Sequence, residues 1–300
     1  MTTSVQKALQ VVQRADDLKD NLELSEVAKQ SPGEGEVLVC VTLRPVNPTD
    51  LYNISGGVYT NQELPYVPGS EGVGTVEHLA ALAVPDKISD KDAAQFWVNP
   101  VTVVGLLEVA DVPKGEILLQ TAAGSVLGRE VITYAKHLGI KTINVVRRAA
   151  QKEVLLSLGA DEVIVTSEED LVQRVKEITG GEGAYAAIDA VGGTTFQEVV
   201  SAVRDGGTAL IYGRLSGSTG QFNIGDLLLR RKVLRGFALP NWLNTKAPQE
   251  REAKLLRVLD LIASGVIKPY SGKVYPLEQF KEAISESQRE GRGGKVFLEG

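Results

Sequence analysis

Histidine and cysteine are scarce in this chain of 300 residues, which has two histidines, His78 and His137, and one cysteine, Cys40. A single cysteine cannot close an intrachain disulfide, so a disulfide-stapled scaffold is excluded. Protein zinc sites are built mainly from cysteine and histidine, and two histidines cannot supply a histidine triad. We therefore expect no metal site. Cys40 lies in the alternating run VLVCVTL, residues 37–43, where we expect it to fill a core position.

Long apolar runs and an excess of basic residues are also absent. No apolar stretch approaches the ~20 residues that a membrane-spanning helix needs. The formal net charge is −6, which argues against a nucleic-acid partner because such proteins usually present a basic face. The first residues carry acidic side chains early and lack an apolar core, so we expect neither a signal peptide nor a transit peptide there.

The order of short motifs indicates two domains, for which 300 residues suffice. Residues 7–46 alternate like antiparallel strands, with a turn signal in SPGEGE at 31–36. From about residue 100, short apolar strands alternate with helical stretches, which predicts parallel βαβ units and a doubly wound sheet. After residue 265, strand-like KPYSGKVYPL and KVFLEG flank a helical stretch. We therefore predict an α/β protein with a β-rich lobe at 1–98 and 266–300 and a dinucleotide-binding domain at 99–265.

One strand-to-helix turn has the composition of a phosphate site. The strand EILLQ ends at Gln120, the small residues of 121–128 follow, and a helix is predicted to begin near Gly128. Small residues let backbone amides approach a pyrophosphate, and a helix N-terminus stabilises its charge. The spacing is Gly124-x-x-x-Gly128 rather than the usual G-x-G-x-x-G. Taken alone, the turn fits either cofactor binding or tight packing.

The following strand, KTINVV, ends in Arg147 and Arg148. In dinucleotide-binding domains an acidic residue about 20 residues past the turn binds the ribose 2′-hydroxyl of NAD, whereas arginine accommodates the 2′-phosphate of NADP. The alternative is a pair of solvated arginines at a strand end. The missing acid together with the two arginines favours NADPH.

Several motifs together resemble those of a known family. They include NPTD (47–50), GGVY (56–59), PGSEGVGTV (68–76), AAQFWVNPVT (93–102), QTAAGSVLG (120–128) and AIDAVGG (187–193). With these motifs the chain resembles the zinc-free medium-chain dehydrogenases/reductases, and most of all their mitochondrial-type trans-2-enoyl thioester reductase branch; quinone oxidoreductases are close relatives. The resemblance implies a Rossmann sheet joined to a β-rich GroES-like lobe.

The resemblance also implies roles for individual residues. Tyr59 matches the proton donor, with Tyr52 as the reserve acid, while Asn47 and Asp50 brace the loop that carries Tyr59. Trp242 resembles an aromatic of the acyl pocket but fits a core position equally well. The positions that match cofactor contacts are Asn99, Ser125, Val126, Leu127, Gly128, Arg147, Arg148, Tyr212, Gly213, Arg214, Leu215, Phe237, Ala238, Leu239 and Lys295.

From the resemblance we expect NADPH-dependent reduction of the C2=C3 double bond of enoyl thioesters, in mitochondria and by a homodimer. The segment LRGFALP at 234–240 is a plausible edge strand for such a dimer. Quinones or small α,β-unsaturated carbonyls are the alternative substrates.

The segment around Glu77–His78 departs from the family pattern. In the family, the strand ending GVGTVE continues into further strands of the lobe, but here it runs directly into HLAALAVPDKIS. We interpret Glu77–His78 as a deletion junction, with a naturally shortened loop as the alternative. Missing strands would leave unpaired edges in the lobe. A non-catalytic NADPH-binding protein is therefore a further alternative function.

Overall fold

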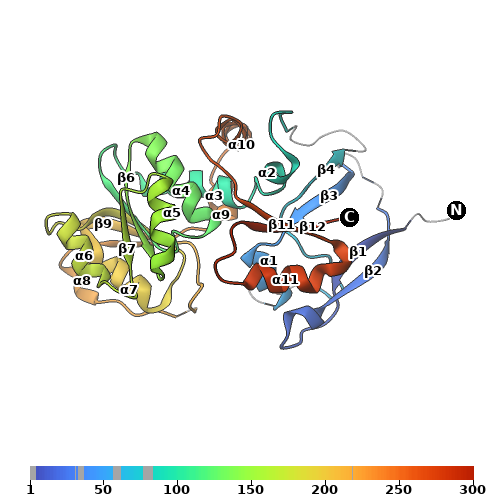
Figure 1. Cartoon of the computed structure of the whole chain (residues 1–300), viewed down its shortest axis with the longest axis horizontal. Helices are drawn as coiled ribbons and strands as arrows, with labels where there is room; N and C mark the ends of the chain where they lie inside the picture. The colour runs from blue at the N-terminus through green and yellow to red at the C-terminus, as the bar shows by residue number, and fades with distance from the viewer. Residues whose placement is uncertain (1–4, 31, 33–36, 57–61, 77–83, 218) are drawn as a thin grey trace. The chain divides into compact units, whose positions relative to one another are not determined.

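The computed structural model describes residues 5–300 apart from 31, 33–36, 57–61, 77–83 and 218. The chain divides into two compact units (Figure 1). Unit 1 comprises Met1–Val98 and Pro269–Gly300, and unit 2 comprises Asn99–Lys268. The sequence placed the return to the first unit slightly earlier, at residue 266.

Unit 2 is built on a six-stranded sheet in which every neighbouring pair is parallel. The strand order is β10-β9-β8-β5-β6-β7, so the direction of winding reverses between β5 and β8. This is the order of doubly wound nucleotide-binding sheets, and it confirms the predicted fold class. The strands are β5 (Ile117–Gln120), β6 (Lys141–Val146), β7 (Glu162–Val165), β8 (Ala184–Asp189), β9 (Val203–Ile211) and β10 (Val233–Gly236).

Helices cover both faces of this sheet because successive strand residues point to opposite sides. Val145 packs with α6 and α7, whereas Val146 packs with α4 and α5. Within the described part of the chain, no helix is long and apolar enough to cross a membrane. The helices of unit 2 are α3 (Asn99–Ala110), α4 (Val126–Leu138), η2 (Ala149–Gln151), α5 (Lys152–Ser157), α6 (Leu171–Ile178), α7 (Gly193–Ala202), α8 (Ile224–Leu228), α9 (Leu239–Asn244) and α10 (Pro248–Ala263).

Unit 1 combines an antiparallel hairpin with a four-stranded sheet of order β11-β12-β3-β4. Its strands are β1 (Val5–Val11), β2 (Leu22–Ala28), β3 (Val39–Pro45), β4 (Val73–Val76), β11 (Ser271–Pro276) and β12 (Lys295–Glu299). Its helices are η1 (Leu18–Asn21), α1 (Pro48–Ile54), α2 (Asp90–Ala94), η3 (Leu277–Gln279) and α11 (Phe280–Gln288). The end of the chain thus pairs with a strand from its first fifty residues, as the predicted two-part lobe requires.

Strand β12 is the centre of unit 1 because it is buried on both faces. Val296 and Leu298 pack with α11 and the hairpin, while Phe297, which is fully buried, packs with Leu43 and Ala94. Burying one large apolar side chain contributes about 1.5–3 kcal/mol. Lys295 lies on the same face as Phe297 by the two-residue alternation of a strand.

The expectation that Cys40 fills the core is wrong, because the structure exposes it. Strand β12 pairs with β3 only at Leu43–Pro45, so Cys40 lies beyond the end of β12 and pairs with β4 alone. Val39 and Val41 on either side are also exposed. The expected junction Glu77–His78 directly follows β4 but lies outside the described residues.

Candidate functional site

The topology of unit 2 gathers the predicted cofactor residues at one edge of its sheet. In doubly wound sheets, ligands bind outside the carboxyl ends of the strands, where the strand order reverses. Residues 125–128 follow β5, Arg147 and Arg148 follow β6, residues 212–215 follow β9, and residues 237–239 follow β10. The edge of the sheet at the carboxyl ends of its strands, here called the carboxyl edge, therefore brings together four segments that are far apart in the sequence.

The turn between β5 and α4 is tightly built. Ser125 is the N-cap of α4, and its hydroxyl accepts a hydrogen bond of 3.0 Å from the backbone N–H of Gly128. A Cβ on Gly128 would lie 2.6 Å from the Cα of Ala123, so only glycine permits this close approach. The helix begins at Val126, slightly before the predicted start near Gly128, because the Ser125 cap fixes the first turn.

Ala122 in this turn has a φ of 49°, in the left-handed region that residues other than glycine rarely adopt. Strain of this kind costs about 1–3 kcal/mol and concentrates at functional sites. The N–H groups of the first turn of a helix have no acceptor within that helix. Val126 and Leu127 therefore present their amides at the carboxyl edge of the sheet, where an anion can accept from them.

Two buried amides that the sequence analysis did not single out connect this turn to the sheet. Gln120, at the end of β5, donates to the carbonyl of Gly128 at 3.0 Å and to the Asn144 side chain at 2.6 Å. Asn144 in turn donates to the carbonyl of Glu162 at 3.0 Å. Both amides are fully buried, so their hydrogen bonds fix the first turn of α4 against β5, β6 and β7. The sequence does contain a signal for these two residues, because each is a polar residue within a strand that is otherwise mostly apolar.

A second buried contact lies where the strand order reverses. The Thr121 hydroxyl donates to Asp189 at 2.5 Å, and Asp189 also accepts from the backbone N–H of Gly192 at 2.7 Å. Asp189 is fully buried and lies in the motif AIDAVGG, and the sequence pattern alone predicts no role for it. It joins the ends of β5 and β8.

Backbone hydrogen bonds connect the remaining loops. Tyr212 N–H donates to the Asp189 carbonyl at 2.9 Å, and Phe237 N–H donates to the Ile211 carbonyl at 2.8 Å. A Cβ on Gly213 would lie 2.5 Å from the Ala190 carbonyl oxygen. The loops after β8, β9 and β10 therefore form one continuous edge.

The two arginines of the predicted 2′-phosphate site are both exposed directly after β6. Gln151 from η2 lies against the turn, because a Cβ on Gly124 would come within 2.0 Å of the Gln151 side-chain nitrogen. The edge therefore offers amides for a pyrophosphate and two cations for a further phosphate. These groups fit a phosphorylated dinucleotide.

Asn99 belongs to α3, and Trp242, which belongs to α9, packs against α3. Asn99 is the first residue of α3 and is buried. Trp242 is buried within unit 2, with its ring 6.2 Å from that of Phe237, and both rings lie over Gly105. The structure therefore gives Trp242 a core position in its own unit.

The remaining candidates belong to unit 1. Tyr59 lies outside the described residues. Tyr52 is half-buried on α1. Lys295 is 3% exposed, and its ammonium group donates to the side-chain oxygen of Asn47.

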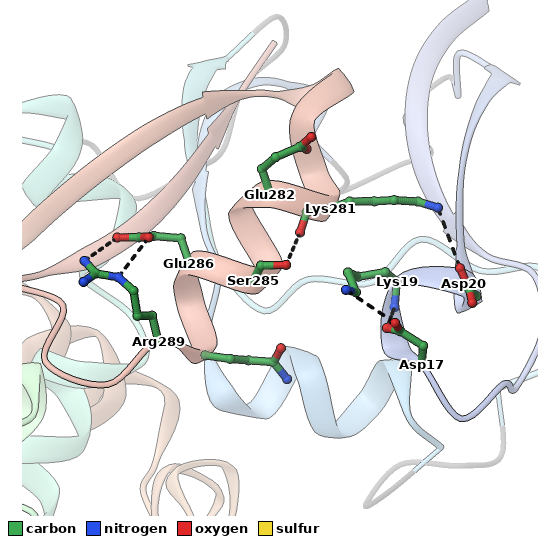
Figure 2. Close-up of a pocket in the computed structure, with 9 residues that line it drawn as sticks. Asp17, Lys19, Asp20, Lys281, Glu282, Ser285, Glu286 and Arg289 are labelled. Carbon is green, nitrogen blue, oxygen red and sulfur yellow. Dashed lines mark hydrogen bonds and ion pairs between the residues drawn. The ribbon is translucent and has the colours of Figure 1, made fainter.

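A pocket of about 730 Å³ lies between η1 and α11 and contains none of the predicted site residues (Figure 2). Its cations already have partners. Lys19 pairs with Asp17 at 3.4 Å, and Arg289 pairs with Glu286 at 2.8 Å. Lys281 lies 3.7 Å from Asp20. This pocket is therefore less suited to an anionic cofactor than the carboxyl edge of unit 2. Among the described residues, no group of three histidine, cysteine, aspartate or glutamate side chains could hold a metal ion.

Two family models match the chain. The model described as "Alcohol dehydrogenase GroES-like domain" matches residues 33–90, and that described as "Zinc-binding dehydrogenase" matches residues 127–260. A mitochondrial enoyl-[acyl-carrier-protein] reductase of Xenopus tropicalis is 30% identical, with 89% of this chain and 88% of that protein covered. This alignment runs over 308 residues, more than the 300 of the chain, so gaps fall within this chain.

Solved structures also match over nearly the whole length. A crystal structure of a "putative NADPH:quinone reductase" from Bacillus thuringiensis has a TM-score of 0.91 and 29% identity, with 98% of each chain covered. A quinone oxidoreductase from Escherichia coli, solved with NADPH, has a TM-score of 0.89 and 26% identity, with 98% of this chain and 100% of that chain covered.

Proposed function

Because the chain belongs to the medium-chain dehydrogenase/reductase family, we propose that it is an NADPH-dependent reductase of the C2=C3 double bond of trans-2-enoyl thioesters. The similarity to an enoyl reductase over 88% of that protein's length carries this proposal. The motif GGVY, with Tyr59 at its end, supports it.

In this proposal the carboxyl edge of unit 2 holds the cofactor. The first-turn amides of α4 bind the pyrophosphate, and Arg147 and Arg148 bind the 2′-phosphate in charge-assisted hydrogen bonds. Asn99 and the segments 212–215 and 237–239 complete the contacts of this unit. Bound NADPH would supply a hydride to the β-carbon of the substrate.

The residues of the chain would then have to supply a proton to the α-carbon of the resulting enolate. A phenol has an unperturbed pKa of about 10 and can donate when it lies within hydrogen-bond reach. We assign this role to Tyr59, with Tyr52 as the second candidate. We propose no metal in this step, since a thioester enolate can be stabilised by hydrogen-bond donors.

Quinone reduction is the second candidate function. The observation that favours it is the TM-score of 0.91 with the NADPH:quinone reductase structure from Bacillus thuringiensis. Both functions use the same cofactor site, so the substrates alone distinguish them.

The gaps in the alignment bear on whether the lobe is complete. We propose that they fall at Glu77–His78, after β4, and that the shortened lobe still supports turnover. Binding of NADPH without turnover would instead favour the non-catalytic alternative.

We also propose a homodimer formed through β10, and a mitochondrial location like that named for the enoyl reductase relative. Strand β10 pairs with β9 and ends the sheet, so its outer edge is open within the described residues. In the segment that leads into β10 and at its first residue, large apolar side chains are strongly exposed: Ile224 70%, Leu228 75%, Leu229 80% and Val233 48%. Open edges and apolar patches of this kind mark interaction surfaces.

The buried Lys232 connects the residue before β10 to α7 and α8. Its ammonium group donates to the carbonyls of Val200 at 2.8 Å and Ser201 at 3.0 Å, at the end of α7. It also lies 3.0 Å from Asp226 on α8. These contacts fix the connection from α8 to β10 on the body of unit 2, so Leu228 and Leu229 point outward from a defined backbone. A twofold pairing of two β10 strands would bury them.

The arginine pair is tested by cofactor affinity. Replacing Arg147 and Arg148 by alanine should raise the Kd for NADPH by about 10–100-fold, since charged hydrogen bonds contribute about 1.5–3 kcal/mol. The Kd for NADH should change little, because NADH lacks the 2′-phosphate. Arg230→Ala with Arg231→Ala, an exposed pair before β10, is the control. Equal affinity of the wild-type protein for NADH and NADPH would refute the assignment.

The proton donor is tested by Tyr59→Phe, which keeps the ring and removes the hydroxyl. We expect turnover of an enoyl thioester to fall by about 10²–10⁴-fold, the usual contribution of general acid catalysis. The Kd for NADPH should stay unchanged. Tyr52→Phe is the matched variant and should turn over like the wild type. If the loss occurs in Tyr52→Phe instead, Tyr52 is the acid.

The dimer is tested by the mass in solution. Replacing Leu228 and Leu229 by glutamate should give a monomer in light scattering, because charge would be buried in the apolar contact. Val154→Glu changes a side chain on α5 that is 46% exposed, and this control should remain dimeric. A wild-type monomer, or a double variant of unchanged mass, would contradict the proposed interface.

A further inference from the structure

A buried group of polar side chains lies in unit 1 where β12, α1 and the segment before β4 meet. Asn47 is fully buried, Lys295 is 3% exposed and Asp50 is 5% exposed. Ser70 and Glu71 contact them from the segment before β4. The family resemblance matches Lys295 to a cofactor contact and implies that Asn47 and Asp50 brace a loop.

Asn47 connects Lys295 to Glu71. The ammonium group of Lys295 donates to the side-chain oxygen of Asn47, and the Asn47 amide nitrogen donates to Glu71 Oε1 at 2.9 Å. The other oxygen of Glu71 accepts from the backbone N–H of Val98 at 2.8 Å. Both polar atoms of the Asn47 side chain are therefore used, which fixes its orientation.

Asp50 completes the group at the N-terminus of α1. One of its oxygens accepts from the backbone N–H of Asn47 at 2.9 Å, which forms a capping box, and the other accepts from the Ser70 hydroxyl at 2.6 Å. Burial is the largest effect and leaves the pKa of Asp50 and of Glu71 above the ordinary value, although the charge of Lys295 acts in the opposite direction on both. Every carboxylate oxygen of Asp50 and Glu71 accepts a hydrogen bond, and such bonds favour the ionised forms. The charge of Lys295 thus acts on one buried carboxylate, Asp50, and one half-buried carboxylate, Glu71.

The opposite end of α1 is also held by side chains from other segments. Arg14 donates to the carbonyl of Ile54 at 2.7 Å, and the Tyr66 hydroxyl donates to that of Asn53 at 2.8 Å. A helix of 7 residues is marginal on its own, so its position depends on such contacts. Tyr52 lies on α1, and Tyr59 follows α1 outside the described residues.

We propose that Lys295 is a positioning residue, which acts through Asn47 to fix the N-terminus of α1 and thereby the helix that carries or precedes both candidate acids. Glu71 has the same role from the other side of Asn47. This inference rests on the proposed function, and it differs from a direct contact of Lys295 with the cofactor. The two roles predict different kinetics.

The first test compares Lys295→Met with Lys295→Arg. If Lys295 positions α1, the methionine variant should lose roughly tenfold or more in kcat for an enoyl thioester, because small misplacements of reacting groups cost that much. Its Kd for NADPH should stay within about twofold of the wild type. Lys295→Arg keeps a cation and should recover part of the lost kcat. A raised Kd for NADPH with unchanged kcat would overturn the proposal and support the cofactor contact.

Glu71→Gln provides a second variant in case Lys295→Met does not fold with two unpaired carboxylates. A glutamine has one acceptor and one donor where Glu71 has two acceptors, so it would set a donor against either Val98 N–H or Asn47. We expect the same loss of kcat with unchanged NADPH affinity. Glu286→Gln on α11 is the control and should behave like the wild type.

Hydrogen exchange separates failure of this inference from failure of the proposed function. The amides of residues 48–54 should exchange faster in Lys295→Met and in Glu71→Gln, but not in Glu286→Gln, whatever reaction the protein catalyses. A wild type without reductase activity refutes the proposed function and leaves this structural prediction to be decided by exchange. Unchanged exchange of α1 in Glu71→Gln would overturn the positioning role.

Discussion

The buried ammonium group of Lys295, whose charge acts on the carboxylates of Asp50 and Glu71, organises the polar contacts of unit 1. A charge in an apolar interior is stable only when it is paired and hydrogen-bonded. Lys295 meets this requirement through Asn47, although the two residues are 248 positions apart in the sequence. The contact brings the last strand of the chain to the start of α1, and Glu71 extends it to the backbone at Val98. The same contacts that stabilise the lobe therefore set the place of α1.

In unit 2, buried polar side chains hold the turn that brings backbone amides to an anion site. Gln120 and Asn144 tie the first turn of α4 to the sheet, and Asp189 joins the ends of β5 and β8. These buried groups leave the amides of Val126 and Leu127 at the edge where the strand order reverses. A preorganised site of this kind binds a phosphate without reordering the chain.

Much of this architecture follows from the sequence alone. The alternation of strands and helices predicted the parallel sheet, and the small residues of 121–128 predicted the turn before α4. The Ser125 cap starts α4 earlier than the glycine suggested. The alternation around Cys40 indicated a core strand, yet the residue is exposed because β12 pairs only with the far end of β3. That pairing joins the two ends of the chain, and no local pattern contains it.

The polar contacts were the hardest to predict. Lys295 could be matched to a cofactor contact by its motif, but its bond to Asn47 depends on a tertiary arrangement. Gln120 and Asn144 interrupt apolar strands, which was a usable signal, although only the structure shows that they bond to each other. The pairing of Thr121 with Asp189 likewise requires knowing that β5 and β8 are neighbours.

The central claim is the proposal that this chain is a working reductase of enoyl thioesters. The most direct measurement is the rate of NADPH oxidation by the wild-type protein with a short trans-2-enoyl thioester and, separately, with a small quinone. The account predicts that kcat/KM for the thioester exceeds that for the quinone by roughly tenfold or more, because the proposed acid, Tyr59, would protonate an enolate. A faster reaction with the quinone, or NADPH binding without thioester turnover, would contradict it.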